Sequence, residues 1–264
     1  MSTVISADGT HIGYSVTGSG PALILIDGAM THRGFGPMPK LAAALQDSFT
    51  VYLYDRRGRG ESGPGVTAYT PHREVEDLAA VLEAAGGSAH VAAVSSGAVL
   101  AADAAATLDG ITGLALYEPP MIVDGSHAPR PEDFVSRVEA MIAAGDEGGA
   151  VRAFLRSVDV PPLAVALMSL TPPFRKMKAS AATLPHDLRI LGDTGRGQPL
   201  DAERWAKLSA PATVLDGGRS PQYMRSAARA LSQALPGAGY RTLPGQTHMF
   251  NAAVLAAAIK QCLR

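Results

Sequence analysis

The sequence predicts an α/β protein, with a doubly wound, mostly parallel sheet and an inserted helical lid. Short apolar segments alternate with helical patterns as far as Tyr117, and the alternation resumes at Pro211. Helical patterns alone fill the segment between these two points. One apolar run, His90–Val94, breaks into Ser-Ser-Gly and becomes an alanine-rich helix. Alternation of this kind requires parallel strands joined by crossover helices, with ligands bound at the carboxyl ends of the strands.

The first part of the chain predicts a hairpin followed by parallel units. Thr3–Ala7 and His11–Thr17 flank Asp8-Gly9, a pair typical of a two-residue turn. Four mostly apolar runs are typical of strands buried on both faces, namely Ala22–Ile26, Phe49–Tyr54, His90–Val94 and Ile111–Tyr117. Three segments have the spacing of crossover helices, namely Leu41–Leu45, Arg73–Ala85 and Ala98–Leu108.

After Pro119-Pro120 the pattern changes to that of an insertion. Helical segments are expected near Asp133–Ala144 and Gly149–Ser157, broken by Pro161-Pro162 and Pro172-Pro173. The remaining elements are expected to be a strand at Pro211–Leu215, a helix at Met224–Leu235, a strand at Tyr240–Leu243 and a helix at Ala252–Cys262. We therefore divide the chain into a core, residues 1–118 and 207–264, and a helical cap or lid, residues 119–206.

Composition excludes several classes of function. The 264 residues include 23 basic and 24 acidic side chains, giving a net charge of −1 with no basic stripe for nucleic acid or membrane. The single Cys262 offers neither a disulfide nor a metal-ligand spacing, and no cofactor is implied. Without a leader or a long apolar run, the chain is expected to be cytoplasmic, with a small molecule as its partner. The oligomeric state stays open, a homodimer being one option.

The Ser-Ser-Gly turn has the pattern of a nucleophile elbow. A serine held in a strained strand-to-helix turn needs small residues two positions away, and Ser95 has Ala93 and Gly97 there. Ser96 fits worse, because Val94 lies two positions before it. An ordinary turn with a serine helix cap is the alternative.

Other strand ends supply partners for such a serine. Glu118 ends a strand before two prolines, and His248 lies between the last strand and the last helix. The chain order Ser, acid, His then matches one known arrangement of a catalytic triad. The amides of Ala29 and Ser96 are the expected oxyanion donors, with Gly28 and Met30 beside the substrate.

A further motif follows the strand Phe49–Tyr54 and is typical of one protein family. The chain reads Asp55-Arg56-Arg57-Gly58-Arg59-Gly60-Glu61-Ser62, which resembles the D-x-R-G-x-G-x-S turn of the α/β-hydrolase fold. The resemblance to that fold covers essentially the whole length of the chain. In that family the motif organises the loops, so Asp55 and Arg57 are expected to be structural. The family commonly has His-Gly where this chain has Asp27-Gly28.

The usual acid position of the family is also altered. Alignment through Gly217 puts Ser220 where that acid is expected, and a serine cannot stabilise an imidazolium. The alternative acid position of the family corresponds to Glu118, which we favour over Asp216 because Asp216 lies too early in its loop.

The combined motifs are similar to those of the zearalenone lactonase group, which opens a macrocyclic lactone by serine attack. The resemblance implies a serine hydrolase that cleaves a carboxylic ester or lactone of a hydrophobic small molecule through an acyl-enzyme. Met168 and Phe174 of the lid and Met249 are expected to contact the substrate. Two alternatives remain, a carbon–carbon bond hydrolase and a non-hydrolytic ligand-binding or cyclase-type homologue.

Overall fold

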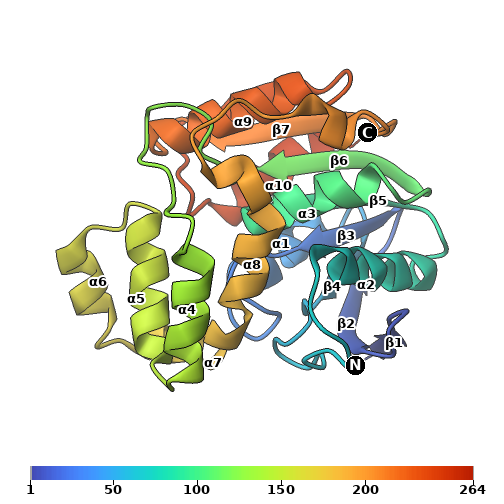
Figure 1. Cartoon of the computed structure of the whole chain (residues 1–264). Helices are drawn as coiled ribbons and strands as arrows, with labels where there is room; N and C mark the ends of the chain where they lie inside the picture. The colour runs from blue at the N-terminus through green and yellow to red at the C-terminus, as the bar shows by residue number, and fades with distance from the viewer. Residues whose placement is uncertain (1, 264) are drawn as a thin grey trace.

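An eight-stranded sheet runs through the computed structural model, which describes residues 2–263 (Figure 1). The strand order is β1-β2-β4-β3-β5-β6-β7-β8; β1 and β2 pair antiparallel with their neighbours, and the other pairs are parallel. The strands are β1 (Ser2–Ile5), β2 (His11–Gly18), β3 (Ala22–Ile26), β4 (Thr50–Tyr54), β5 (Ala89–Val94), β6 (Ile111–Tyr117), β7 (Ala212–Gly217) and β8 (Gly239–Leu243). The predicted doubly wound, mostly parallel sheet is confirmed.

The central strands are buried on both faces, and their sequence shows why. Side chains of a strand point alternately to opposite faces. In β3, Leu23 and Leu25 pack into the apolar cluster on one face, and Ile24 and Ile26 pack into the cluster on the other. A strand of this kind needs an uninterrupted apolar run, which is the signal that predicted β3 and β6 with their observed bounds.

Two layers of helices cover the sheet (Figure 1). One apolar cluster joins the sheet to α1 and α10, and the other joins it to α2, α3 and α9. These helices are α1 (Met38–Leu45), α2 (Pro71–Ala84), α3 (Ser96–Ala105), α9 (Gln222–Ala234) and α10 (Ala252–Cys262). Every residue of α3 except Asp103 is buried, and its small alanines let the helix lie close against the sheet.

The chain between β6 and β7 forms a separate group of helices beside the sheet (Figure 1). They are α4 (Phe134–Ala143), α5 (Glu147–Ser157), α6 (Pro162–Met168), α7 (Pro172–Ala179) and α8 (Leu184–Leu191), with short 3₁₀ turns at Ala181–Thr183, Gly192–Gly195 and Ala202–Trp205. We call α4–α8 the inserted helices. They share an apolar cluster of their own, which Met30 of the loop after β3 joins.

The helical pattern is interrupted at both proline pairs, as predicted: α5 ends at Ser157 and α6 at Met168. Pro162 and Pro172 are also the first residues of α6 and α7, because proline fits the first turn, where its missing N–H costs no hydrogen bond. One detail of the sequence prediction was wrong. The predicted two-residue turn between the first strands is longer: Ile5 pairs with His11, and Ser6 N–H donates to Thr10 O across the loop.

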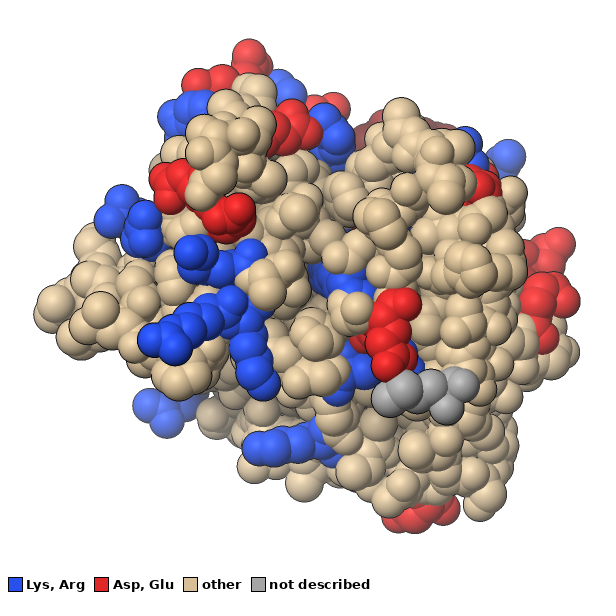
Figure 2. Space-filling view, turned by 90° about the horizontal axis from the view of Figure 1, so that it is seen from below, with Lys and Arg blue, Asp and Glu red and all other residues tan. Residues whose placement is uncertain are grey.

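Charged side chains are unevenly spread on the surface. Seen from below, Lys and Arg side chains gather toward the inserted helices, while most acidic groups on this face lie nearer its edges (Figure 2). Helix α7 carries Arg175, Lys176 and Lys178, and the Lys176 ammonium lies 5.5 Å from the centre of the Phe35 ring. Among residues 2–263, no helix combines the length and apolar character needed to cross a bilayer.

The two-sided burial of β3 predicts a large cost for truncation there. Leu25→Ala should lower the free energy of unfolding by about 2–5 kcal/mol, because Leu25 is fully buried and a cavity would remain. Leu163→Ala in α6 is the matched control, since Leu163 is 73% exposed and its truncation should change stability by less than about 0.5 kcal/mol. Denaturant unfolding of both variants measures the difference, and equal midpoints would contradict the assignment of the core.

Candidate active site

Ser95 occupies the strained turn between β5 and α3. Its backbone has φ 56° and ψ −131°, a region that non-glycine residues rarely adopt. The Ser95 N–H donates to Tyr117 O at 2.9 Å, which ties the turn to the end of β6. Its side chain caps no helix amide, so the alternative of an ordinary capping serine does not describe it.

The neighbouring Ser96 lies in a different environment. It is buried, and its hydroxyl donates to Asp187 Oδ1 at 2.7 Å while accepting from Arg56 Nη1 at 3.1 Å. A hydroxyl engaged in this way is part of the interior. Of the two serines, Ser95 has the strained backbone of the turn, and Ser96 has a buried hydroxyl with two polar partners.

Glycines allow two close approaches around Ser95. A Cβ at Gly28 would lie 2.9 Å from the Ser95 Cβ, and a Cβ at Gly97 would lie 2.6 Å from Asp27 O. Both distances are shorter than carbon and oxygen atoms tolerate, so these positions admit only hydrogen. The loop after β3 and the first turn of α3 consequently meet at Ser95.

Glu118 and His248 form a hydrogen-bonded pair at the ends of β6 and β8. His248 Nδ1 lies 2.9 Å from Glu118 Oε2, and Glu118 Oε1 accepts from the Gly217 N–H at 2.7 Å. The Glu118 side chain is fully buried, whereas that of His248 is 34% exposed. Glu118 also has a positive φ of 48°, so its backbone is strained as well.

Asp216, the second candidate acid, has other partners. Although it is fully buried, its Oδ2 accepts from the Tyr240 hydroxyl at 2.8 Å and lies 3.5 Å from Arg225 Nε. Of the two acids that the sequence offered, the structure brings Glu118 to His248.

The loops that carry these side chains are tied to one another. The Tyr117 hydroxyl donates to Thr247 O at 2.7 Å, and the Tyr117 ring packs edge-on against Phe250. Glu118 N–H donates to Leu215 O at 3.0 Å. The residue before Glu118 therefore holds both Ser95 N–H and the His248 loop, which fixes the three strand ends relative to one another.

The predicted oxyanion donors lie at two loop ends. Within residues 2–263, no protein oxygen accepts a hydrogen bond from the Ala29 amide, whereas the Gly28 N–H donates to its neighbour Asp27 Oδ1 at 2.8 Å. Ser96 is the first residue of α3, where a backbone N–H has no acceptor within the helix. Met30, next in the loop, has a positive φ of 60°.

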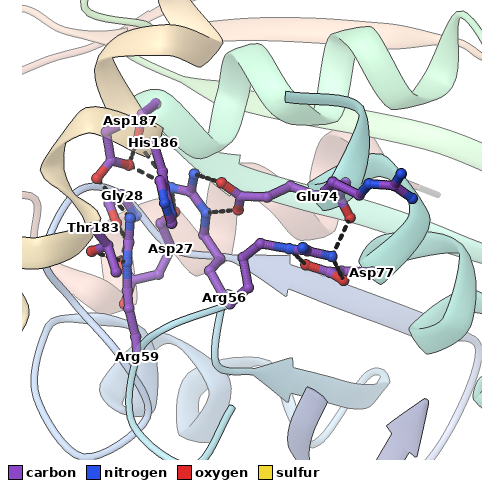
Figure 3. Close-up of polar contacts among 12 residues, drawn as sticks. Asp27, Gly28, Arg56, Arg59, Glu74, Asp77, Thr183, His186 and Asp187 are labelled. Carbon is purple, nitrogen blue, oxygen red and sulfur yellow. Dashed lines mark hydrogen bonds and ion pairs between the residues drawn. The ribbon is translucent and has the colours of Figure 1, made fainter. Parts of the chain in front are cut away.

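A buried charge network lies directly behind this loop (Figure 3). Arg56 binds both oxygens of Glu74, at 2.6 and 2.9 Å, and also binds Asp187 Oδ1 at 2.8 Å. Arg59 binds Asp187 Oδ2 at 2.6 Å and the Gly28 carbonyl at 2.5 Å. All four charged groups are almost completely buried.

Sequence reasoning gave these residues no role. It singled out Arg57, which pairs with Asp77 and Asp8 as a structural residue should. Arg56 and Arg59 occupy the variable positions of the same turn, and Asp187 comes from α8. The available signal was three arginines in a turn expected to be buried, since buried guanidinium groups require carboxylate partners.

Burial also changes the ionisation of Asp27, at the end of β3. Loss of hydration raises the pKa of Asp27 to about 6, although Thr31, the Gly28 amide and the two arginines favour the charged form. This carboxyl group consequently titrates near pH 6, directly beneath the loop that carries Ala29.

The other predicted contact residues are spread out. Phe174 is buried in the apolar cluster of the inserted helices, Met168 packs at its margin, and Met249 is 80% exposed beside His248. A cavity of about 260 Å³ lies between α4 and α8, and neither Ser95 nor His248 lines it. Its lining residues are Glu139, Ile142, Ala143, Ala182, Pro185, His186 and Arg189. No cluster of three or more metal-ligating side chains occurs in the described part of the chain.

Comparison with known proteins places this geometry in context. A family model described as "Alpha/beta hydrolase family" matches residues 20–258. The fold is similar to that of an alpha/beta hydrolase from Sphaerobacter thermophilus, with a TM-score of 0.92, 43% identity and full coverage of both chains. The comparison with curated proteins gives no match.

More distant structures share the fold. A thermophilic esterase from Thermogutta terrifontis has a TM-score of 0.72 at 20% identity, covering 100% of this chain and 97% of that chain. An enol-lactonase from Burkholderia xenovorans has a TM-score of 0.72 at 20% identity, covering 99% of each chain.

The raised pKa of Asp27 predicts a specific pH dependence of stability. Because the folded pKa lies above the unfolded value near 3.8, the stabilisation is complete below pH 3.8 and is lost as the pH rises through 6. The wild type should lose on the order of 3 kcal/mol from this group by pH 7.5, and Asp27→Asn should not. Denaturant unfolding of both proteins from pH 4 to 7.5 gives the difference, and parallel profiles would contradict it.

Proposed function

Because the chain belongs to the alpha/beta hydrolase family, we propose that it is a serine hydrolase that cleaves a carboxylic ester or lactone of a hydrophobic small molecule. Ser95 is the nucleophile, His248 the general base and Glu118 the acid that orients the histidine. Ala29 and Ser96 provide the oxyanion amides. The proposal goes beyond the family, whose fold serves many reactions, and stands on the chemistry of the site.

One observation carries the proposal, the contact of 2.9 Å between His248 Nδ1 and Glu118 Oε2. A fully buried carboxylate that accepts Nδ1–H fixes the neutral tautomer of the ring, so that Nε2 is left with its lone pair. The same carboxylate stabilises the imidazolium that forms when Nε2 takes a proton. The Gly217 amide, 2.7 Å from Oε1, holds the carboxylate in place.

The chemical steps follow from this arrangement. Ser95 Oγ attacks the ester or lactone carbonyl carbon while His248 Nε2 removes the hydroxyl proton. The carbonyl oxygen becomes an oxyanion that accepts hydrogen bonds from the amides of Ala29 and Ser96. Collapse of this intermediate breaks the C–O bond of the ester; the proton on Nε2 passes to the leaving oxygen, and an acyl-serine remains.

Hydrolysis of the acyl-serine repeats these steps with water. His248 Nε2 removes a proton from water, the hydroxide adds to the acyl carbon, and the Ser95 oxygen leaves with the proton held by the histidine. The carboxylic acid is released and the serine regenerated. For a lactone, the alcohol and the acid belong to one opened molecule.

The surroundings support a hydrophobic substrate. Residues 119–206 form the proposed lid, whose apolar cluster reaches the loop after β3 through Met30. Gly28, which lies against Ser95, is a proposed substrate contact, as are Met30, Met168, Phe174 and Met249. The esterase and the enol-lactonase that share this fold are similar examples, named for the substrate class proposed here.

Covalent labelling tests the nucleophile. A fluorophosphonate probe should add one adduct per chain to the wild type, with the modified peptide containing Ser95, because an activated serine attacks phosphorus. Ser95→Ala should give no adduct, as measured by intact-protein mass and peptide mapping. A folded wild type that stays unlabelled would favour the alternative of a ligand-binding homologue.

A matched pair of variants tests the acid. Glu118→Gln should lower kcat for a p-nitrophenyl ester by about 10³-fold or more, since a neutral amide cannot stabilise the imidazolium and also favours the wrong tautomer. Asp216→Asn, at the end of the neighbouring strand and equally buried, should leave kcat within about threefold. The reverse order of effects would assign the acid to Asp216.

A further inference from the structure

Resting on the proposed hydrolase function, we infer that Arg59 is a positioning residue of the oxyanion hole, held there by Asp187 of the inserted helix α8. Figure 3 shows both side chains between α8 and the loop at Gly28. Both residues are buried, and neither is among the proposed substrate contacts. Their proposed role is to fix and polarise the peptide that carries the Ala29 amide.

The peptide geometry is the first step of the argument. The Gly28 carbonyl and the Ala29 N–H belong to one planar peptide unit and point in opposite directions. Arg59 Nη1 donates to the Gly28 carbonyl oxygen at 2.5 Å. A bond that fixes the carbonyl therefore fixes the direction of the N–H, and a cationic donor draws electron density toward the oxygen and strengthens the N–H as a donor.

The second step is that Arg59 itself cannot move freely. Its Nε donates to the Thr183 hydroxyl at 2.9 Å and its Nη2 to Asp187 Oδ2 at 2.6 Å. The three nitrogens of the guanidinium thus bind three different groups in the fixed fork of arginine. Arg59, Thr183 and Asp187 are all at least 98% buried, so water does not weaken these bonds.

The third step is that one carboxylate serves both halves of the oxyanion hole. Asp187 Oδ2 holds Arg59, and Asp187 Oδ1 accepts from the Ser96 hydroxyl at 2.7 Å. Ser96 provides the second oxyanion amide. Arg56 adds a bond of 2.8 Å to the same Oδ1 and reaches the Asp27 carbonyl at 3.3 Å.

Residues 119–206, the proposed lid, therefore also support the proposed oxyanion hole from the side away from the substrate. Thr183 and Asp187 both lie in that region, 124 and 128 residues after Arg59. Their bonds connect its position to the direction of an amide that acts only on the developing oxyanion. A change in these bonds should alter kcat more than KM, because the ground-state carbonyl depends less on that amide.

Two equally buried arginines of one turn provide the test. Arg59→Lys keeps a cation but cannot make all three bonds. We expect kcat for p-nitrophenyl acetate to fall about tenfold and KM to change by less than twofold. The fall in kcat should be smaller than the fall caused by removing an oxyanion donor itself. The inhibition constant of phenylboronic acid, whose adduct on Ser95 is tetrahedral and anionic, should rise by a similar factor. Arg57→Lys is the control, since Arg57 is bound by Asp77 and Asp8 and not by the oxyanion loop, and its kcat should stay within twofold.

The outcomes separate the two proposals. If the fluorophosphonate probe does not label Ser95 in the wild type, the proposed function is overturned. If the wild type is labelled but Arg59→Lys keeps the wild-type kcat and boronate affinity, only the positioning role is overturned. A thermal unfolding midpoint for each variant establishes that it is folded at the assay temperature. If Arg59→Lys does not fold, Thr183→Val leaves Arg59 its bonds to Gly28 and Asp187 and removes the Nε bond, together with the bond that the hydroxyl donates to Ser180 O. This variant should lower kcat about threefold, and an unchanged kcat contradicts the proposal.

Discussion

The strained carboxyl-end turns of the parallel sheet are the constraint on which the rest of the site depends. In the described residues, four non-glycine residues have positive φ, and Met30, Ser95 and Glu118 are three of them. Each comes directly, or within a few residues, after the end of β3, β5 or β6, which lie side by side in the sheet. Backbone strain of this kind persists only where the surroundings over-determine it. Here the surroundings are a sheet buried on both faces and the bonds of Tyr117 to Ser95 and to the His248 loop.

The position of the loop after β3 also depends on a set of ion pairs, which are buried so deeply that water cannot take the place of either partner. Removing one partner from such a pair leaves an uncompensated charge, which is far more costly than replacing both partners with apolar groups. The Arg56 and Arg59 pairs join the turn after β4, helix α2 and helix α8 behind the loop that comes after β3. These segments are distant in sequence, so the network couples the orientation of the inserted helices to the sheet more specifically than apolar packing does.

Local pattern and chain order are enough to predict the central strands and the place of the candidate acid. Continuous apolar runs predict β3 and β6, and a strand end before two prolines predicts where Glu118 lies. The sequence does not predict the partners of Arg59, because the contact with Asp187 spans 128 residues and both side chains belong to types that usually face solvent. Proline pairs are ambiguous for a different reason: the same residue that ends one helix suits the first turn of the next, and only the packing of α6 and α7 decides.

The charge balance beneath the loop after β3, which carries the proposed oxyanion amide, explains how an aspartate can stand at position 27. Burial opposes ionisation of Glu74 and Asp187, but their bonds to the two arginines lower the pKa of both carboxyls, so the four groups carry two positive and two negative charges. An ionised Asp27 adds one negative charge beside the Gly28–Ala29 peptide, where an oxyanion would be opposed by it. The histidine common at this position in the family brings no such charge.

In this chain Arg56 donates to the Asp27 carbonyl and Arg59 to the Gly28 carbonyl, so positive charge lies against the same two peptides. The acidic residue and the two arginines therefore form one electrostatic unit, and replacements at positions 27 and 59 should be strongly non-additive, because each alone upsets a balance that both together maintain.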